Sequence, residues 1–477
     1  MRARVPLLWL VVVVVGVVAM ASACPPEQPP PAHKGFDFHL PASLPEPPVP
    51  SDNPMTAEKV ALGRHLFYDK RLSANETRSC GSCHMQADAF TGGAVFRTGD
   101  SGEPTTRNEM TLVNAAYAPV YTWADPSPVT LEEQALIPMY GENPVELGLT
   151  DHDTEQFEKL RQDPALAALF KSAFPSDADP VTIKNITQAL ASFERTILSG
   201  GSPVDHFLVD GDDGALDADG QHGLSRFFSE DLECYHCHGG FNWTDSAVQA
   251  GALADKPPYH NNGLYNLNGT GDYPLIDQGL FSFTQNPADM GKFKAPTLRN
   301  LEKTGPYMHD GSVVDFDAIL DHYAAGGRTI PGGNDDGSDE DGSKNVHKDP
   351  LVKGFVLNDA DRAAMKAFFK GLTDPDLLSN VDLSPAFECP TAGVSCPSAP
   401  PSFTHDVQPI IENSCLYCHS DGGGAQAEQL GDYASVHALH DKLVTQVTGC
   451  LMPADARLPD ADREAILQWL ACGDPNN

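Results

Sequence analysis

Three segments of the chain share the pattern Cys-x-x-Cys-His: residues 80–84, 234–238 and 415–419. This spacing places two thiols on one helical turn, where they can bond to the two vinyl groups of a haem while the adjacent histidine ligates the iron. A zinc site would need four ligands from paired motifs, and a redox dithiol would lie in a βαβ unit. The pattern predicts three covalent c-type haems. Their attachment residues are Cys80, Cys83, Cys234, Cys237, Cys415 and Cys418, and their proximal iron ligands are His84, His238 and His419.

The composition restricts the classes of protein that could carry these motifs. The chain has 477 residues, of which 41% are hydrophobic, and a formal net charge of −35. Two or three globular domains are expected for this length. The strong negative charge argues against a nucleic-acid partner, which would require lysine and arginine surfaces, and favours a basic protein partner.

The N-terminus has the pattern of an export signal. Arg2 and Arg4 precede an uncharged, valine-rich stretch that ends in small residues before Cys24. This predicts a signal peptide over residues 1–23, of lipoprotein type with lipidation at Cys24, and hence a periplasmic protein that can be anchored to the membrane. A simple cleaved signal and an uncleaved anchor are the alternatives. The proline-rich residues 24–53 are interpreted as a tether.

Apolar residues at helical spacing recur along the chain, and strand-like alternation is scarce, which predicts a mainly α fold. A helix is expected to begin near Thr56, and helical patterns cover residues 181–198 and 358–372. The acidic, glycine-rich residues 332–349 are interpreted as a solvated surface loop. The expected units are residues 54–202, 203–387 and 403–477, with a linker at residues 388–402, and the first two units resemble a distant duplication.

Four cysteines remain besides Cys24 and the six haem thiols. They are Cys389, Cys396, Cys450 and Cys472. An even number in an exported protein predicts disulfides, and three connectivities are open. The most local pairing joins Cys389 to Cys396 and Cys450 to Cys472.

The third unit contains a candidate sixth ligand for its iron. Met452 is the only methionine of residues 403–477 and precedes a proline, as in small cytochromes. A thioether ligand would raise the haem potential and give a closed electron-transfer site. His437 and His440 are the alternative ligands.

Several longer motifs resemble the bacterial di-haem cytochrome c peroxidase and MauG family. The resemblance covers roughly residues 56–375, and the motifs lie at residues 62–73, 106–108, 131–135, 295–300 and 304–311. It implies two cytochrome c-like domains packed around a calcium ion, with peroxide reacting at the first haem and electrons entering at the second. The third haem unit would be an extension.

The resemblance also implies roles for individual residues. Glu146 matches the distal acid of the peroxide haem, Gln134 matches the amide of the distal pocket, and Trp123 matches the indole between the haems. The family's Trp-Asp-Gly-Arg run is replaced here by residues 123–126, Trp-Ala-Asp-Pro. The residues that match the calcium ligands are Asn108, Thr304 and Pro306.

Two departures from the peroxidase pattern point to the MauG-like branch. Fourteen residues after His309, where peroxidases place a methionine ligand to the second haem, this chain has Tyr323. Asp100 replaces a histidine that closes the first haem in many peroxidases. A carboxylate is a poorer ligand for haem iron, so the first haem is expected to be open in the oxidised protein.

These observations predict an exported tri-haem oxidoreductase that reduces hydrogen peroxide to water with electrons from a cytochrome or other redox protein. One alternative is MauG-like, peroxide-dependent oxidation of a partner protein. The other is a plain electron-transfer cytochrome without peroxide turnover.

Overall fold

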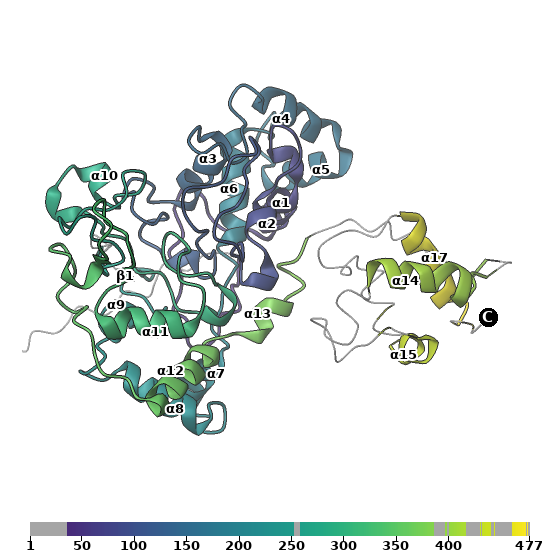
Figure 1. Cartoon of the computed structure of the whole chain (residues 1–477). Coiled ribbons are helices and arrows are strands. Elements are labelled where there is room, and N and C mark those ends of the chain that lie inside the picture. The colour runs from purple at the N-terminus through teal and green to yellow at the C-terminus, as the bar shows by residue number, and fades with distance from the viewer. Residues whose placement is uncertain are drawn as a thin grey trace, which may run out of the picture.

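The computed structural model describes residues 36–251, 258–385, 396–397, 400–415, 430, 432–439, 443, 460–473 and 475. These residues are mainly helical (Figure 1). The sheet found among them consists of β1 (Thr329–Ile330) and β2 (Glu340–Asp341), which pair antiparallel with Thr329 opposite Asp341. The predicted fold class is therefore confirmed.

The first group of helices surrounds a core that includes Leu62, Phe67 and Phe193. Thr56 and Thr182 cap α1 and α6, because each hydroxyl oxygen accepts a hydrogen bond from a first-turn N–H. The α-helices are α1 (Ala57–Tyr68), α2 (Cys80–Cys83), α3 (Leu131–Tyr140), α4 (Asp153–Gln162), α5 (Pro164–Ala173) and α6 (Ile183–Glu194). The 3-10 turns are η1 (Lys70–Leu72), η2 (Gln86–Asp88) and η3 (Ala115–Tyr117).

The second group surrounds a separate core that includes Phe227, Trp243 and Phe368. Asn358 caps α12, with its side-chain oxygen accepting from Asp361 N at 2.8 Å. The helices are α7 (Pro203–Asp205), α8 (Ala218–Phe227), α9 (Tyr235–His238), α10 (Phe281–Thr284), α11 (Phe316–Ala325), α12 (Asp359–Gly371) and α13 (Pro375–Ser379). The π-helical turn is η4 (His206–Asp210), and the 3-10 turns are η5 (Pro287–Asp289), η6 (Leu301–Lys303) and η7 (Gly342–Lys344).

In both groups, the helix before the haem motif crosses the group's last long helix at a glycine. A Cβ on Gly63 of α1 would lie 1.9 Å from Ala189 O of α6. A Cβ on Gly223 of α8 would lie 2.0 Å from Ala364 O of α12. Equivalent aromatic pairs flank the crossings, with ring centroids 5.2 Å apart for Phe67 and Phe193 and 5.0 Å apart for Phe227 and Phe368. This shared geometry supports the proposal that the two groups arose by duplication.

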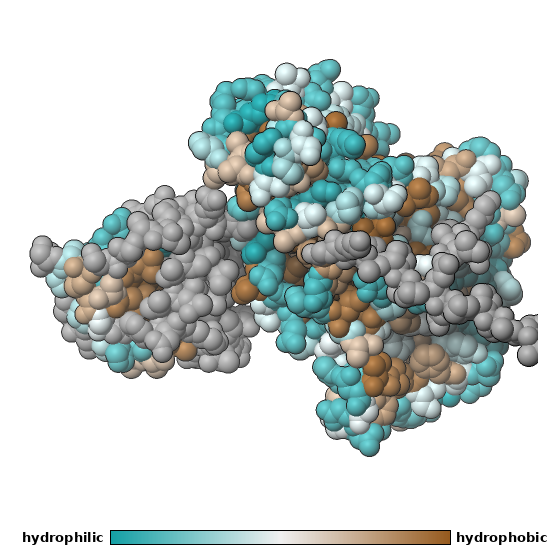
Figure 2. Space-filling model, turned by 180° about the vertical axis from the view of Figure 1, so that it is seen from behind, coloured by the Kyte–Doolittle hydropathy of each residue, from teal (hydrophilic) through white to brown (hydrophobic). Residues whose placement is uncertain are grey.

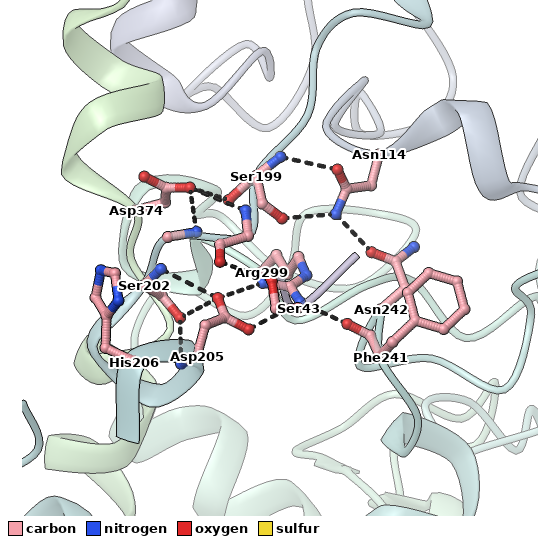
Figure 3. Close-up of polar contacts among 12 residues, drawn as sticks. Ser43, Asn114, Ser199, Ser202, Asp205, His206, Phe241, Asn242, Arg299 and Asp374 are labelled. Atoms are coloured by element: carbon pink, nitrogen blue, oxygen red, sulfur yellow. Dashed lines mark hydrogen bonds and ion pairs between the residues drawn. The ribbon is translucent and has the colours of Figure 1, made fainter. Parts of the chain in front are cut away.

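Buried polar groups connect the two groups (Figure 3). The Asn114 amide nitrogen donates to Ser199 O and to Asn242 Oδ1, each at 2.9 Å. Asp374 follows α12 and accepts hydrogen bonds from Ser199 Oγ at 3.1 Å and Gly200 N at 3.0 Å. Because all these groups are paired, their burial is compatible with a stable contact between the two halves.

The segment after α12 returns to the first group, although the sequence placed residues 203–387 in one unit. Leu377 and Leu383 pack in the first core, and the Tyr68 hydroxyl donates to Leu383 O at 2.7 Å. Because α13 is only five residues long, its sequence contains no extended apolar repeat from which this return could have been predicted.

Part of the segment 332–349 also differs from the expected solvated loop. Glu340 is only 2% exposed, and its carboxylate accepts a hydrogen bond from Asn266 N. The pairing of β1 with β2 draws this glutamate inward, whereas Asp335, Asp336 and Asp339 remain exposed.

The third group packs around Phe403, Val436 and Trp469. Its elements are η8 (Phe403–Val407), a π-helical turn, and the helices α14 (Gln408–Ser414), α15 (Tyr433–Ala438) and α17 (Asp460–Ala471). A disulfide joins Cys396 to Cys472 across 76 residues, so the most local pairing is wrong. Packing of α17 on η8 brings the two ends of this group together, which the sequence spacing did not show. Cys389 and Cys450 lie outside the described residues.

Among the described residues, no helix is both long and apolar enough to cross a membrane. The face in Figure 2 is mixed, with hydrophilic residues beside smaller apolar areas. Residues 1–23 and Cys24 lie outside the described part of the chain, so the signal peptide and the lipidation stay predictions.

We expect Gly223→Ala to lower the free energy of unfolding by about 1 to 3 kcal/mol, because the added methyl group meets a backbone carbonyl that cannot rotate away. This expected loss is what remains after the helix propensity gain of about 1 kcal/mol has been subtracted from the steric cost. Urea unfolding of the haem-loaded protein measures the effect. Gly220→Ala, on the same helix, is the control because its added methyl group meets the Leu216 and Asp217 side chains. Equal midpoints for both variants would contradict the role of the crossing.

Candidate active site

The first Cys-x-x-Cys-His motif occupies a short capped helix. Ser79 N donates to Ser82 Oγ at 3.0 Å, so α2 starts at Cys80 and places Cys83 one turn later. His84 ends this turn, and its Nδ1 donates to Phe90 O at 3.0 Å. Burial lowers the pKa of His84, which keeps the ring neutral. With Nδ1 protonated, Nε2 keeps its lone pair and can bind a metal.

A cavity lies beside this motif and brings several predicted residues together. Cys80, Cys83, His84, Gln134 and Glu146 all line it. Its other lining residues are Phe67, Arg78, Ser79, Thr98, Gly99, Thr105, Leu112, Ala135, Pro138, Leu147, Leu190 and Glu194.

The donors of this cavity suit a covalently bound haem. Cys80, Cys83 and His84 line the cavity together with the apolar residues Phe67 and Leu190. Arg78 Nε is buried and has no hydrogen-bond partner among the described residues. A buried guanidinium nitrogen without a partner suits a carboxylate of the cofactor, so the residues fit the group that the motif predicts.

A close backbone approach positions Glu146. A Cβ on Gly99 would lie 2.0 Å from Val145 O, so only glycine permits the two segments to run this close. Asp100 N donates to Glu146 O at 2.7 Å, and Leu147 N donates to Pro138 O at 2.9 Å. These bonds fix the backbone on both sides of the carboxylate, and burial raises its pKa.

The Asp100 carboxylate is bound to a neighbouring loop. Its Oδ2 accepts from Asn75 N at 3.2 Å, and its Oδ1 accepts from Thr77 Oγ1 at 3.2 Å. Asp100 is not among the residues that line the cavity. The position where many peroxidases carry a closing histidine therefore holds a side chain that is already hydrogen bonded elsewhere.

Trp123 lies in a separate cluster outside the cavity lining. Its Nε1 donates to Asn108 O at 2.8 Å, and its carbonyl accepts from Lys294 N at 2.9 Å. It packs with Tyr273 and Phe293. Trp123 thus connects the Asn108 segment of the first group to the Lys294 segment of the second, near Pro296.

The second motif repeats the histidine arrangement of the first. His238 Nδ1 donates to Pro296 O at 3.1 Å, and burial lowers the pKa of the ring, so Nε2 keeps its lone pair. Tyr323 of α11 approaches this motif: its pKa is raised to about 12, first by burial and further by the nearby Cys237 and Cys234 thiols, against a hydrogen bond from the Asn262 side chain. The predicted tyrosine therefore lies beside the second haem motif.

Sequence reasoning missed a histidine near this motif. His260 Nε2 bonds to Asp245 at 2.8 Å and its Nδ1 bonds to Asp349 at 2.7 Å. Burial opposes its charge, but the hydrogen bonds to Asp245, Cys237 and Asp349 raise its pKa to about 11. His260 is thus a half-buried cation held between two acids. Its partners are 15 and 89 residues away, so no local spacing indicates the group.

Glu194 is a second missed residue of the first cavity. It lies four residues after Leu190 and eight after Ile186 on α6, and both of those residues are buried. This period places it on the buried face. This spacing was overlooked because Glu194 is followed by Arg195, and an acid next to a base is usually interpreted as a solvent-exposed pair.

The residues matched to calcium ligands lie in two neighbouring segments. Asn108 N donates to His309 O at 2.9 Å, which joins the Asn108 segment to the one containing Thr304 and Pro306. The Asn108 amide nitrogen donates to Ala94 O at 2.8 Å, so its Oδ1 is the atom left for a cation.

The described part of the third group covers only a fraction of its predicted site. Cys415 follows α14 and packs against the third core. His437 of α15 stacks on Tyr433 with ring centroids 5.5 Å apart. Cys418, His419, His440 and Met452 lie outside the described residues.

Known proteins resemble this chain in sequence and in fold. The family described as di-haem cytochrome c peroxidase matches residues 57–214. The cytochrome-c peroxidase IdrP1 of Denitromonas iodatirespirans is 37% identical over 306 residues, which cover 61% of this chain and 79% of that protein. The methylamine utilization protein MauG of Methylorubrum extorquens is 34% identical over 294 residues, which cover 62% of this chain and 75% of that protein.

A solved structure shares both fold and sequence with the chain. A MauG-like protein associated with microbial copper homeostasis superposes with a TM-score of 0.70 and 40% identity, covering 73% of this chain and 99% of that one. The di-haem peroxidase BthA of Burkholderia thailandensis, at 19% identity and a TM-score of 0.53, shares the fold. The chain therefore belongs to the di-haem cytochrome c peroxidase and MauG family, and it is a peroxidase-like oxidoreductase with covalently attached c-type haems.

Proposed function

We propose that this protein reduces hydrogen peroxide to water in the cavity beside Cys80, Cys83 and His84, with electrons from a cytochrome or another redox protein. The observation that carries the proposal is that Glu146 and Gln134 share this cavity with the haem-attachment motif. The bound haem would supply an iron that binds peroxide and exchanges electrons.

The side chains of the cavity perform the proton chemistry. Cys80 and Cys83 tether the cofactor, and His84 presents Nε2 to its iron while Phe90 O fixes the ring. The Glu146 carboxylate takes a proton from the near oxygen of peroxide and returns it to the far oxygen, which then leaves as water. Burial suits Glu146 to this exchange, because its raised pKa brings the two protonation states closer in free energy. The Gln134 amide orients the peroxide.

The remaining predicted sites serve electron transfer in this proposal. His238 and Tyr323 hold the second haem through Cys234 and Cys237, and Trp123 lies between the halves as an electron relay. A third haem on Cys415, Cys418, His419 and Met452 serves as a built-in donor or relay, with His437 and His440 as the alternative ligands to Met452.

Calcium binds the segments of Asn108, Thr304 and Pro306. The proposed units remain residues 54–202, 203–387 and 403–477, exported to the periplasm and anchored through Cys24.

Peroxide-dependent oxidation of a partner protein is the second candidate function. Tyr323 beside the second motif favours it. Although burial favours its neutral phenol, binding to a ferric iron would displace the proton, and a phenolate ligand stabilises the ferric and higher states of a haem and lowers its potential. The similarity to MauG and to a MauG-like structure supports the same branch.

Stopped-flow mixing of the oxidised protein with peroxide separates the candidate functions. Fast consumption that depends on an added reduced cytochrome is expected for the peroxidase. A long-lived state two electrons above the resting protein, formed without any donor, indicates MauG-like chemistry. No reaction at all would leave only electron transfer and refute both.

We expect Glu146→Gln to keep the fold and the haems but to slow the reaction with peroxide by about 10²-fold or more, because the amide cannot carry the proton. Rapid mixing with peroxide measures the rate, and the visible absorption spectrum checks haem content. Glu142→Gln is the matched control, since Glu142 is exposed on the same segment. A wild-type rate in Glu146→Gln would remove this residue from the mechanism.

We expect the first haem of the oxidised protein to be high-spin and open, because the Asp100 carboxylate is bound to Asn75 and Thr77. Cyanide should then bind the oxidised protein without any reductant. Electron paramagnetic resonance should show the high-spin signal. Three low-spin haems, with cyanide binding only after partial reduction, would contradict this assignment.

A further inference from the structure

Glu194 is a buried acid in the wall of the first haem cavity. It is the last residue of α6 and only 4% exposed. It lines the same cavity as Cys80, Gln134 and Glu146. Its Oε2 is buried and has no hydrogen-bond partner among the residues that the structure describes. The mechanism proposed above does not use it.

The cation nearest in sequence to Glu194 is engaged by another acid. Arg195 Nη1 donates to Oε1 of Glu132 on α3, and Arg195 Nη2 donates to Oε2 of the same residue, each at 2.9 Å. Asn53 Nδ2 also donates to Glu132 Oε1, which further stabilises that carboxylate as an anion. Lys59 of α1 bonds to Asn53 Oδ1 at 2.9 Å. Arg195 is thus paired with Glu132, and the part of the chain that the structure describes shows no ion pair of Glu194.

The environment therefore favours the neutral form of Glu194. Burial raises its pKa to about 8, with Arg195 opposing the shift and Glu132 adding to it. Its other titratable neighbours are the Tyr121 phenol and the Cys80 thiol, and Glu146 and Arg78 line the same cavity. A carboxylic acid that stays protonated at neutral pH can donate a proton in a site that excludes bulk water.

A purely structural role does not explain this residue. A structural buried acid is normally paired with a base or with several hydrogen-bond donors, as Glu132 is. An unpartnered carboxyl oxygen at a cavity wall costs stability, and such costs are typical of groups that act on a ligand.

We propose that Glu194 is a second proton donor of the peroxide cavity, distinct from the proton-shuttling Glu146. Reduction of one hydrogen peroxide breaks the O–O bond and consumes two electrons and two protons to give two waters. The electrons come from the reduced donor protein, the Glu194 carboxyl group supplies one of the two protons through its O–H bond, and the other proton comes from solvent. The carboxylate that remains is protonated again from solvent. This inference rests on the proposed peroxide reduction at the same cavity.

Infrared spectroscopy of the haem-loaded, oxidised protein tests the protonation directly. Exposed carboxyl groups ionise near pH 4, so a carboxylic acid C=O band that persists at pH 7 reports a buried protonated acid. We expect this band in the wild type and in Glu158→Gln, a control on the exposed face of α4. Glu109 and Glu146 can also contribute to this band, because burial raises the pKa of both. Glu194→Gln should therefore lower the intensity of the band, and Glu194→Asp should restore it.

Peroxide kinetics on the same samples tests the role of the proton. Glu194→Gln should slow the reaction of the reduced protein at least about 10-fold, a smaller loss than for Glu146→Gln. An unchanged infrared band in Glu194→Gln, or a wild-type rate in this variant, would overturn the role of Glu194 and leave the proposed function intact. If the wild type itself does not react with peroxide, the proposed function fails, and the proton-supply role fails with it.

Discussion

Two helix crossings without intervening side chains set the geometry of both haem-binding halves. At Gly63 and at Gly223, the backbone of the helix before the haem motif contacts a carbonyl of the last long helix of its group, Ala189 O or Ala364 O. Such contacts leave little freedom in the distance between the helices, because protein interiors are closely packed. The crossing of α1 with α6 places Leu190 and Glu194 against the first cavity. The cavity wall therefore depends on a residue that has no side chain.

Three glutamates near the first cavity show how the environment assigns different roles to one residue type. Glu132 is held as an anion by Arg195 and Asn53 and joins α3 to α6. Glu146 is half-buried, with its backbone fixed on both sides. Glu194 is almost completely buried and forms no ion pair with any residue that the structure describes. The pKa of a carboxyl group depends on its surroundings, so these three acids differ in their degree of protonation at the same pH.

The sequence predicted the features that depend on local spacing. The three haem motifs, the cap at Thr56 and the amphipathic helix α12 all follow from residues within one or two turns of each other. The shared cavity of His84, Gln134 and Glu146 was predicted only through family resemblance, because these residues are 12 to 62 positions apart. Contacts between distant segments were missed: the His260 group, the return of Leu383 to the first core, and the Cys396–Cys472 disulfide. Each depends on tertiary packing, which cannot be deduced from the periodicity of the sequence.

The Cys396–Cys472 disulfide has a consequence for the biogenesis of the third unit. The segment that this bond closes also contains Cys415 and Cys418, and in the proposed tri-haem protein their thiols would have to stay reduced until they bond to a haem. In that proposal, one pair of cysteines in this segment is oxidised to a disulfide, while the other pair stays reduced in the same compartment until the haem is attached. Thiol–disulfide exchange proceeds through mixed disulfides, so early oxidation could join Cys415 to Cys396 or Cys472 and block haem attachment. Maturation of the proposed third haem would thus require an order of events, in which haem attachment at Cys415 precedes or excludes exchange with the closing disulfide.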